Sequence, residues 1–521
     1  MRHYTSSVKT RVMAINQLKA GAVLSYAVLG VSNLVGLLYT PYMLRTMGQS
    51  EYGLYSLAAS VIAYLTILDL GFGNAIVRYT AKFRAEGKTD QQYFMFGMFI
   101  LLYSIIGIIA LLIGSALYFN VNAMFGDTMT LEELDKARIL IGLMIFNLAV
   151  TFPLSIFGSI ITAYEDFIFQ KAIQIVRILL NTAVMIVLLK LGYRAIGMAV
   201  VATLFNIATL LLNYWYCMHK IKIRIYFGKF QWRFLGEVAI YSFYIFLNVI
   251  MDRIYWSTGQ VVLGIFAGTA AVAVFALAIQ LEQIYMSFSM AISGVFLPKV
   301  TAMATTEQPS EKAISDLFIR TGRIQYIVMA FILTGFILFG RQFIILWAGA
   351  DYANAYPIAL LFFIPLTIPL IQNLGITILQ ARNQMQFRSV LYIIIALCSL
   401  GLQIPLVKYY GGIGCAIAVS AALVAGQIIV MNIYYYKKQR INIPKFWKEI
   451  LKMSIAPSSI GIVAYFLLMN MSLDTVVSLG LGIAVFSLIY IPIFWFIGMN
   501  QYERDLLGNP LKNMILQFLP Q

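Results

Sequence analysis

Apolar runs of about 20 residues recur along the whole chain, and this feature constrains the fold more than any other. A helix of that length crosses a hydrocarbon core of about 30 Å. The composition agrees, since 61% of the 521 residues are hydrophobic and 11% are charged, whereas soluble domains carry about 25% charged residues. A transmembrane β-barrel would show alternating strands of about ten residues instead. The sequence therefore predicts an all-α polytopic membrane protein.

We count about fourteen membrane-spanning helices in these apolar runs. The N-terminal segment 1–11 is polar and basic, and no small-residue cleavage site follows a short apolar stretch. We therefore expect no removable signal peptide. The predicted spans are 19–44, 53–77, 93–119, 138–163, 171–190, 195–218, 236–264, 270–296, 324–346, 355–380, 389–408, 412–436, 453–471 and 476–498.

Basic residues gather in alternate loops between these spans. If the N-terminus is cytoplasmic, most of the 37 Lys and Arg residues fall in cytoplasmic segments, as the positive-inside rule requires. The longest outer loop, Asn120–Lys136, is then acidic. We expect both termini to lie in the cytoplasm. The net charge of +16 follows from this loop pattern, so we do not expect nucleic-acid binding.

An internal repeat with an offset of about 220 residues predicts two related lobes. Gly48 aligns with Gly268 and Tyr55 with Phe275, and further matches follow in the same order across six spans. Because each copy holds an even number of spans, the lobes are parallel, an arrangement that secondary transporters use with a binding site between the halves. The predicted parts are an N-terminal lobe of six helices (1–218), a basic cytoplasmic linker (219–235), a C-terminal lobe of six helices (236–436), a second basic linker (437–452), two further helices (453–498) and a cytoplasmic tail (499–521).

One stripe of polar side chains runs along the seventh predicted span, at helical spacings of three and four. A charge near the middle of a membrane helix costs roughly 2.5 kcal/mol or more, so we expect this stripe to face a water-filled interior. Through the repeat, Asp252 aligns with Ser32 and Arg253 with Asn33, in mid-membrane. The alternative is a pair of buried charges that fixes helix packing, with the tyrosines serving as ordinary membrane packing. The candidates for the wall of a central cavity are Arg253, Asp252, Asn248, Tyr244, Tyr241, Asn33 and Ser32, with Tyr255 on the same face.

Three acidic residues are candidates for ion coupling or gating. Asp252 belongs to the stripe, and Asp69 precedes Gly71 and Gly73, which should loosen the helix. Glu282 lies deep in the eighth predicted span. The alternatives are a glycine-mediated helix contact for Asp69 and a structural hydrogen-bonding role for Glu282, with Ser289 and Ser293 beyond it at near-helical spacing.

Basic residues near the span ends are candidates for a phosphate-attracting cavity, or they snorkel to the interface. These are Arg45, Arg78, Lys299 and Arg341. No Walker loop, His-Glu-x-x-His or Gly-x-Ser-x-Gly motif occurs, so we expect a transporter and not an enzyme. The three cysteines and two histidines fit neither a disulfide framework nor a metal site, and we expect no cofactor.

Several segments resemble bacterial polysaccharide-biosynthesis membrane proteins, the lipid-linked-oligosaccharide flippases of the multidrug/oligosaccharidyl-lipid/polysaccharide (MOP) exporter superfamily. The resemblance implies two six-helix lobes in a V shape (the MATE-like MOP fold), two extra C-terminal helices, alternating access, and a location in the inner membrane of a bacterium. It also implies a cationic cavity for a polyprenyl-pyrophosphate-linked glycan, exchange against H⁺ or Na⁺, and lumen-facing charge at Arg253, Asp252 and Arg78. Membrane lipids, a polysaccharide polymerase and glycosyltransferases are the other implied partners. The segments that carry the resemblance are 41–48, 51–55, 68–78, 264–278 and 294–299.

Three functions remain beside the leading one, which is flipping of a lipid-linked oligosaccharide from the inner to the outer leaflet. A multidrug/cation antiporter of the MATE branch would prefer acidic cavity residues and twelve spans. A flippase for lipid-linked peptidoglycan precursors usually carries several arginines in its first two spans, whereas the first span here has only Arg45. A membrane glycosyltransferase or polymerase would usually show a large outer loop.

Overall fold

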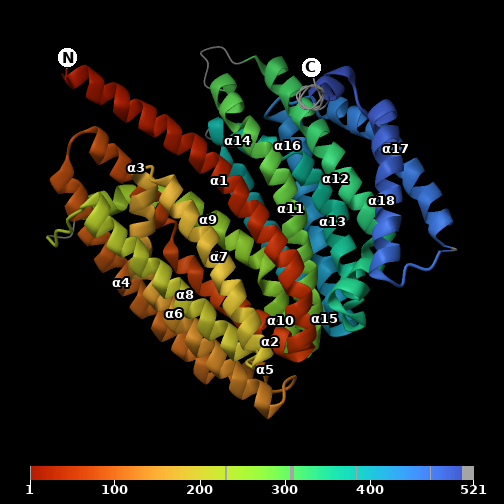
Figure 1. Ribbon diagram of the computed structural model, residues 1–521, viewed down its shortest axis with the longest axis horizontal. Helices are drawn as coiled ribbons and strands as arrows, with labels where there is room; N and C mark the ends of the chain where they lie inside the picture. The colour runs from red at the N-terminus through yellow and green to blue at the C-terminus, as the bar shows by residue number, and fades with distance from the viewer. Residues whose placement is uncertain are drawn as a thin grey trace, which may run out of the picture. The chain divides into compact units, whose positions relative to one another are not determined.

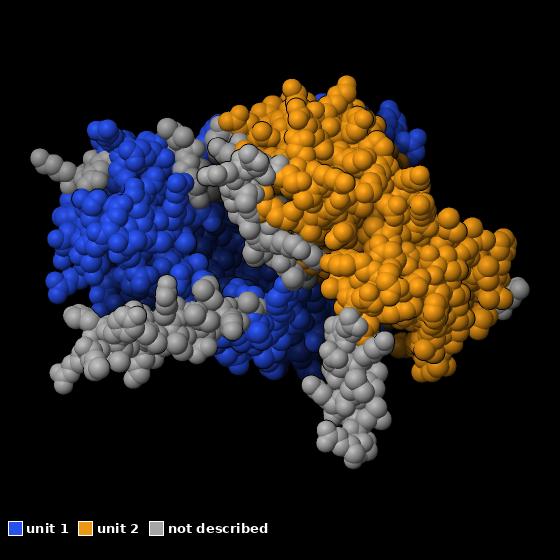
Figure 2. All heavy atoms as spheres, turned by 90° about the horizontal axis from the view of Figure 1, so that it is seen from above, with its two compact units in different colours: residues 1–276, 396–415 blue, residues 277–395, 416–521 orange. Residues whose placement is uncertain are grey.

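The computed structural model describes residues 2–228, 232–304, 310–382, 384–469, 471–506 and 508. All regular elements in these ranges are helical. Packing divides the chain into two compact units, which Figure 2 colours separately: residues 1–276 with 396–415 form unit 1, and residues 277–395 with 416–521 form unit 2. This division follows contacts and not the sequence repeat, so the predicted lobes 1–218 and 236–436 stay a prediction.

Eleven helical segments in the described ranges are long and apolar enough to cross a membrane, or twelve if one pair bent by 45° counts as a single span. The segment Met385–Lys437 alone contains two predicted spans, 389–408 and 412–436, on either side of Gly411, whose φ is 54°. The predicted span 236–264 is divided between two helices that are not among the eleven. The all-α, multi-pass membrane fold is confirmed, whereas the number fourteen is not.

Unit 1 is built around helix α6, which packs against α4 and α8, while α1 runs along α7 (Figure 1). A capping box starts α6, in which the Thr130 side chain and Glu133 satisfy each other's main-chain N–H groups. The elements are α1 (Arg2–Met47), α2 (Gln49–Leu65), η1 (Thr66–Asp69), α3 (Phe72–Ala85), α4 (Thr89–Phe119), α5 (Val121–Phe125), α6 (Leu131–Ala163), α7 (Phe167–Lys190), α8 (Ala195–Tyr216), η2 (Cys217–Ile221), α9 (Trp232–Trp256) and α10 (Thr258–Phe266).

The remaining helices belong mainly to unit 2, where α12 packs against α13, α17 and α18. Two helices cross the division: α11 begins in unit 1, and the middle of α15 belongs to it. The elements are α11 (Gly268–Ala304), α12 (Glu311–Ala348), η3 (Ala350–Tyr352), α13 (Ala355–Ile371), α14 (Leu374–Ala381), α15 (Met385–Leu423), η4 (Val424–Val430), α16 (Met431–Lys437), α17 (Ile443–Leu468), α18 (Val476–Ile493) and η5 (Phe494–Gly498).

The two C-terminal helices, α17 and α18, are joined to α12 by an apolar cluster. Phe339 of α12 packs there with Met453 of α17 and with Phe486, and all three side chains are buried. Phe486 lies with its ring edge toward Phe339, at a centroid distance of 5.7 Å. Burial of these aromatic side chains is the main attraction between the additional helices and the rest of unit 2.

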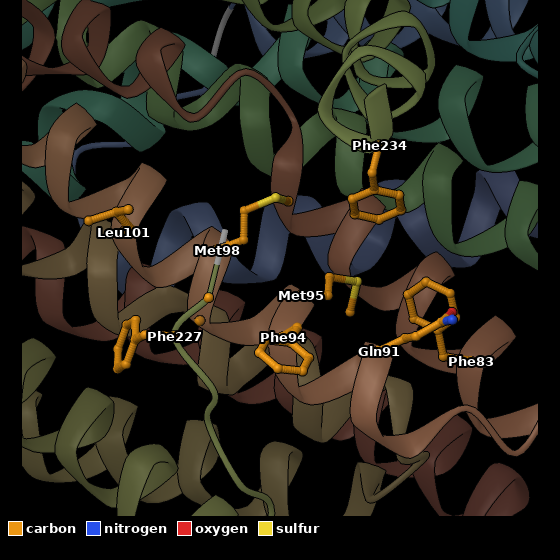
Figure 3. Close-up of a pocket in the computed structure, with 10 residues that line it drawn as sticks. Phe83, Gln91, Phe94, Met95, Met98, Leu101, Phe227 and Phe234 are labelled. Carbon is orange, nitrogen blue, oxygen red and sulfur yellow. The ribbon is translucent and has the colours of Figure 1, made fainter. Parts of the chain in front are cut away.

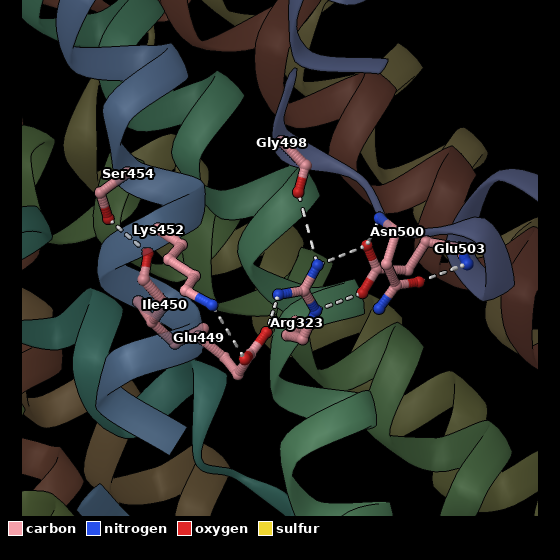
Figure 4. Close-up of polar contacts among 8 residues, drawn as sticks. All are labelled: Arg323, Glu449, Ile450, Lys452, Ser454, Gly498, Asn500 and Glu503. Carbon is pink, nitrogen blue, oxygen red and sulfur yellow. Dashed lines mark hydrogen bonds and ion pairs between the residues drawn. The ribbon is translucent and has the colours of Figure 1, made fainter. Parts of the chain in front are cut away.

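A buried ion network joins the same helices (Figure 4). Arg323 of α12 donates through Nε to Glu503 Oε1 at 2.5 Å and through Nη2 to Glu503 Oε2 at 3.0 Å. Its Nη1 donates to Glu449 of α17 at 2.7 Å, and Nη2 also reaches the Gly498 carbonyl oxygen at 3.4 Å. The bidentate pairing matches the planar guanidinium to a carboxylate, so this network also determines how the C-terminal helices sit within unit 2.

Candidate functional site

Helix α9 carries the polar stripe of the seventh predicted span. Arg253 is partly buried, and its Nε atom is fully buried without a hydrogen-bond partner among the described residues. The neighbouring Asp252 is exposed, and Tyr255 is buried. The side chains of Tyr241, Tyr244 and Asn248 lie outside the described part of the structure. A buried guanidinium N–H with no acceptor is rare in folded proteins and marks Arg253 as a candidate ligand-binding group.

The end of α9 that bears Arg253 is held by α2 within unit 1. Thr258, at the start of α10, forms a short hydrogen bond with the Tyr64 hydroxyl and approaches the Arg253 carbonyl oxygen at 3.5 Å. One turn earlier on α2, Ser60 donates to Gln260 Oε1 at 2.6 Å. These polar contacts between α2 and α10 therefore position the backbone that carries Arg253.

Arg78 lies at the other end of α9. Its neighbour Tyr79 packs edge-on against Phe234, with ring centroids 4.8 Å apart. Arg253 is nineteen residues beyond Phe234 on the same helix, which corresponds to about 28 Å along its axis. Arg78 is exposed. The two arginines are thus too far apart to hold one phosphate group together.

The first-lobe partners of the stripe lie on α1. Ser32 is exposed and Asn33 is partly buried. Whether these residues and Arg253 line one cavity stays a prediction. Among the basic residues near the predicted span ends, Arg45 and Arg341 are exposed, and the Lys299 side chain lies outside the described residues.

Asp69 ends the short helix η1 at a break in the chain. Leu70 and Gly71 follow with φ values of 52° and 74°, so the expected loosening of this helix is confirmed. The Tyr103 hydroxyl donates to Asp69 Oδ1 at 2.7 Å, and Tyr103 is fully buried. η1 also contacts α9. Asp69 therefore has a structural partner in this conformation, next to the helix that bears Arg253.

Glu282 heads a polar stripe on α11 within unit 2. Tyr285, Ser289 and Ser293 follow on the same helix face, and all three have partners. The Tyr285 hydroxyl is 2.7 Å from Thr367 Oγ1, and Ser289 donates to the Leu370 carbonyl oxygen at 2.8 Å.

A buried amide cluster completes this stripe beyond Ser289. Gln325 of α12 donates to Ser293 Oγ at 2.5 Å and to Ser289 Oγ at 3.1 Å, and Asn373 donates to Ser293 Oγ at 3.1 Å. Glu282 differs from these residues, because it is fully buried and neither carboxyl oxygen has a hydrogen-bond partner among the described residues. Burying an ionised carboxylate without donors costs several kcal/mol, so this environment suits a neutral carboxyl or a carboxylate that receives a cation.

Sequence reasoning missed one polar face, on α7. Gln170, Gln174, Arg177 and Asn181 follow the same three- and four-residue spacing as the stripe on α9. Arg177 is partly buried within a candidate span. The signal was therefore present in the sequence, in a span that otherwise reads as continuous apolar residues.

A small apolar pocket of about 90 Å³ lies between α3, α4 and the linker that follows α8 (Figure 3). Aromatic side chains of Phe83, Phe94, Phe227 and Phe234 line it, and none of its described lining residues is charged. The linker runs close by, since the Tyr226 N–H donates to the Tyr93 carbonyl oxygen at 3.2 Å. We assign this pocket to docking of the linker and not to binding of a charged substrate.

The described ranges contain no group of three or more His, Cys, Asp and Glu residues that could hold a metal ion. The cysteines are free thiols, of which Cys217 and Cys415 are buried.

The family model for "Polysaccharide biosynthesis protein" matches residues 18–304. No curated protein sequence matches the chain. The fold is similar to that of "Lipid II flippase MurJ, inward closed conformation", with 18% identity, a TM-score of 0.70 and coverage of 93% of this chain and 100% of that chain.

Two further similar structures belong to the MOP superfamily. An inward-facing MATE family multidrug resistance transporter has 14% identity and a TM-score of 0.59, covering 82% of this chain and 99% of that chain. A MOP superfamily transporter from Pyrococcus furiosus has 15% identity and a TM-score of 0.55, covering 82% and 96%. At these identities the likeness concerns the fold, whereas the family match spans more than half of the sequence. The chain belongs to the polysaccharide biosynthesis protein family and has the fold of the MOP superfamily.

Proposed function

We propose that this protein is a flippase that moves a polyprenyl-pyrophosphate-linked oligosaccharide from the inner to the outer leaflet of the cytoplasmic membrane. The family match supports a role in polysaccharide biosynthesis, and the fold is similar to that of a lipid flippase. The single observation that carries the site is Arg253 of α9, in the seventh predicted span, whose Nε is buried without an acceptor among the described residues. In this proposal both termini are cytoplasmic, and no bond of the substrate is made or broken.

Arg253 would hold the pyrophosphate during transport. Its guanidinium presents a planar set of donors that matches two phosphate oxygens, and it keeps its charge throughout the physiological pH range. Because α2 holds the backbone around Arg253 through Thr258 and Tyr64, a rearrangement of α2 would move the arginine as well. Alternating access would then couple phosphate release to movement of this helix.

The test is a flipping assay with purified full-length protein in liposomes. A radiolabelled polyprenyl-pyrophosphate oligosaccharide is added to one leaflet, and its arrival in the other is measured by access to a membrane-impermeant enzyme. We expect Arg253→Gln to slow flipping at least about tenfold, since charged hydrogen bonds contribute about 1.5–3 kcal/mol. Arg440→Gln removes an exposed arginine and should leave the rate unchanged. Equal rates for the wild type and Arg253→Gln would refute the site.

The same liposomes distinguish the remaining substrates. A peptidoglycan precursor is the second candidate, because the similar MurJ structure is that of a lipid II flippase. Movement of the peptidoglycan precursor but not of the oligosaccharide would replace our proposal with that function. Efflux of an organic cation without any lipid movement would favour a multidrug transporter.

Glu282 would couple transport to an ion gradient. A carboxyl group that is fully buried without donors can accept a proton or a small cation, whereas its neighbours on α11 are engaged in hydrogen bonds. Glu282→Gln keeps the shape of the neutral acid but cannot exchange the proton. We expect this variant to flip lipid at a rate that no longer responds to an imposed H⁺ or Na⁺ gradient. A variant that responds to the gradient as the wild type does would exclude Glu282 from coupling.

A further inference from the structure

Helix α7 has two chemically different faces. On a helical wheel, Gln170, Gln174, Arg177 and Asn181 fall within a sector of about 60°. The opposite side carries exposed aliphatic residues, among them Val176, Leu179, Leu180 and Val187. A membrane helix turns its aliphatic face toward lipid, so the polar face of α7 is directed away from the acyl chains.

Arg177 lies in the middle of this polar face and deep in the span. It is ten residues beyond Phe167, which places it about 15 Å along a helix of 24 residues. No hydrogen bond or ion pair joins its side chain to any residue that the structure describes. Arginines inside membranes are expensive to bury, so an arginine without a partner at this depth indicates a binding function.

Helix α1 runs parallel to α7 on this side. Tyr39 donates to Met185 Sδ at 3.5 Å, across a separation of 146 residues. Gly21 meets Phe167 at the same separation, and a methyl group on Gly21 would lie 2.6 Å from Phe167 Cβ. Because both contacts join residues that are 146 positions apart in the sequence, Arg177 lies level with Val31, next to Ser32 and Asn33 of α1. The two helices thus touch at Gly21 and carry polar groups at the same depth further along.

A pocket of about 530 Å³, with several polar side chains in its lining, opens beside this contact, on the side of α7 where the helix begins. Its size falls within the range of about 300–1,000 Å³ that is typical of small-molecule sites. Its described lining residues offer an ammonium group, amides and hydroxyls, and none of them is a carboxylate. Lys171 and Gln174 have no hydrogen-bond partner among the described residues, whereas Gln170 is bonded to Thr162. The residues that line the pocket are Gly21, Ser25, Thr162, Phe167, Gln170, Lys171 and Gln174.

The nearest acidic side chain in sequence lies outside the lining of the pocket. Asp166, which immediately precedes α7, accepts hydrogen bonds from the Tyr216 hydroxyl at 2.8 Å and from Gln17 at 3.4 Å. It does not line the cavity. Lys171 is therefore the charged group among the described residues that line the pocket, and Arg177 adds a second positive charge further along α7, so the lining favours an anion.

We propose that Lys171, Gln174 and Arg177 form a phosphate-binding path, in which a lipid phosphate enters the pocket beside Lys171 and is passed to Arg177, one helical turn beyond Gln174. Lysine attracts phosphate as a compact charge, and arginine binds two phosphate oxygens through its planar fork. The ligand is a phosphate or pyrophosphate group on a membrane lipid. The choice of polyprenyl pyrophosphate as that lipid rests on the proposed function. The anion site itself does not rest on the proposed function.

The test measures binding to the full-length protein in nanodiscs of neutral phosphatidylcholine. Tritiated polyprenyl pyrophosphate is the probe, and inorganic pyrophosphate and phosphatidylglycerol are the competitors. We expect Arg177→Gln and Lys171→Gln each to weaken probe binding about tenfold or more, while Arg177→Lys retains part of the affinity. The matched control is Lys190→Gln, which removes an exposed lysine from the last turn of the same helix and should bind as the wild type does.

The competitors distinguish the sources of the phosphate. The anion site is supported if inorganic pyrophosphate displaces the probe from the wild type but not from Arg177→Gln. Preference for phosphatidylglycerol over polyprenyl pyrophosphate would keep the site but overturn the named lipid. Unchanged probe affinity in both Arg177→Gln and Lys171→Gln would overturn the site itself. Normal binding by a protein that flips no lipid would refute the proposed function and leave this site standing.

A second measurement covers variants that fail to fold. In a Cys398→Ser background, where the other two cysteines are buried, a Gln174→Cys variant places one reactive thiol in the pocket. We expect a negatively charged thiosulfonate reagent to modify this thiol faster than a positively charged one of similar size. We also expect polyprenyl pyrophosphate to protect the thiol. Faster modification by the cationic reagent, or no protection, would contradict the proposal.

Discussion

Replacing Glu503 with glutamine removes one of the charges that hold Arg323 inside unit 2. The Glu503 side chain is 1% exposed and that of Arg323 is 6% exposed, so water cannot replace the lost carboxylate. The amide retains one acceptor oxygen but turns a donor toward a guanidinium that has only donors. Glu503 also accepts from the Asn500 N–H at 2.9 Å, so the turn after η5 loses support as well.

The expected loss follows from the geometry of this network. Removing one partner of a buried ion pair destabilises proteins by about 3–5 kcal/mol. Glu449 remains bonded to Arg323 and is itself partly exposed, so part of the charge stays compensated. We therefore expect Glu503→Gln to lower the free energy of unfolding by about 3 kcal/mol, at the lower end of this range.

Denaturant unfolding of the purified protein in mixed micelles, followed by tryptophan fluorescence, measures this loss. Glu311→Gln is the matched control, because it breaks an ion pair with Arg440 whose side chains are 47% and 72% exposed. Exposed pairs contribute at most about 1 kcal/mol. Equal effects of Glu503→Gln and Glu311→Gln would refute the reasoning. A double variant, Arg323→Met/Glu503→Met, should recover most of the lost free energy of unfolding, because it buries apolar side chains in place of the ion pair. A double variant that is no more stable than Glu503→Gln would also refute the reasoning.

Two further substitutions probe unit 1 by the same unfolding measurement. Gly53→Ala would place a methyl group 1.9 Å from the Thr269 carbonyl oxygen. Because the backbone has to move, we expect the free energy of unfolding to fall by about 1–3 kcal/mol. An unchanged stability would show that the close approach is not required. Gly30→Ala is its control, since no atom lies within 4 Å of a methyl group added at Gly30. This variant should be more stable by up to about 1 kcal/mol, because alanine favours a helix over glycine. Tyr103→Phe removes the donor to Asp69 and should lower the free energy of unfolding by about 1–3 kcal/mol. A decrease of less than about 0.5 kcal/mol would mean that this hydrogen bond makes no net contribution to stability.

Much of the fold could be predicted because its rules are local. Each apolar run must form a helix, since backbone polar groups in lipid have no other partners. The break after Asp69 was predictable from Gly71 and Gly73. The number of spans was harder, because a run of apolar residues does not reveal where Gly411 interrupts a helical segment of 53 residues.

The candidate site was only partly predictable from periodicity. Spacings of three and four residues identify which helix face is polar, and they singled out the stripe that contains Asp252 on α9. Arg253 and Glu282 were singled out as charges within apolar spans. The same spacing on α7 was readable in the sequence, but Arg177 stands alone as a charge among apolar neighbours and was overlooked. Periodicity also aligned Ser289 and Ser293 with Glu282 without showing which of them had partners.

By itself, then, the sequence determined that this protein is helical, that it spans a membrane many times and which helix faces are polar. Only the tertiary structure decided what each polar group does. Arg323 and Glu503 are 180 residues apart, and no local pattern joins them. Gln325 makes Ser293 a structural residue, while Glu282 on the same helix face has no hydrogen-bond partner among the described residues. The physical reason is that a hydrogen bond depends on two groups meeting in space, and their helices are brought together only by packing.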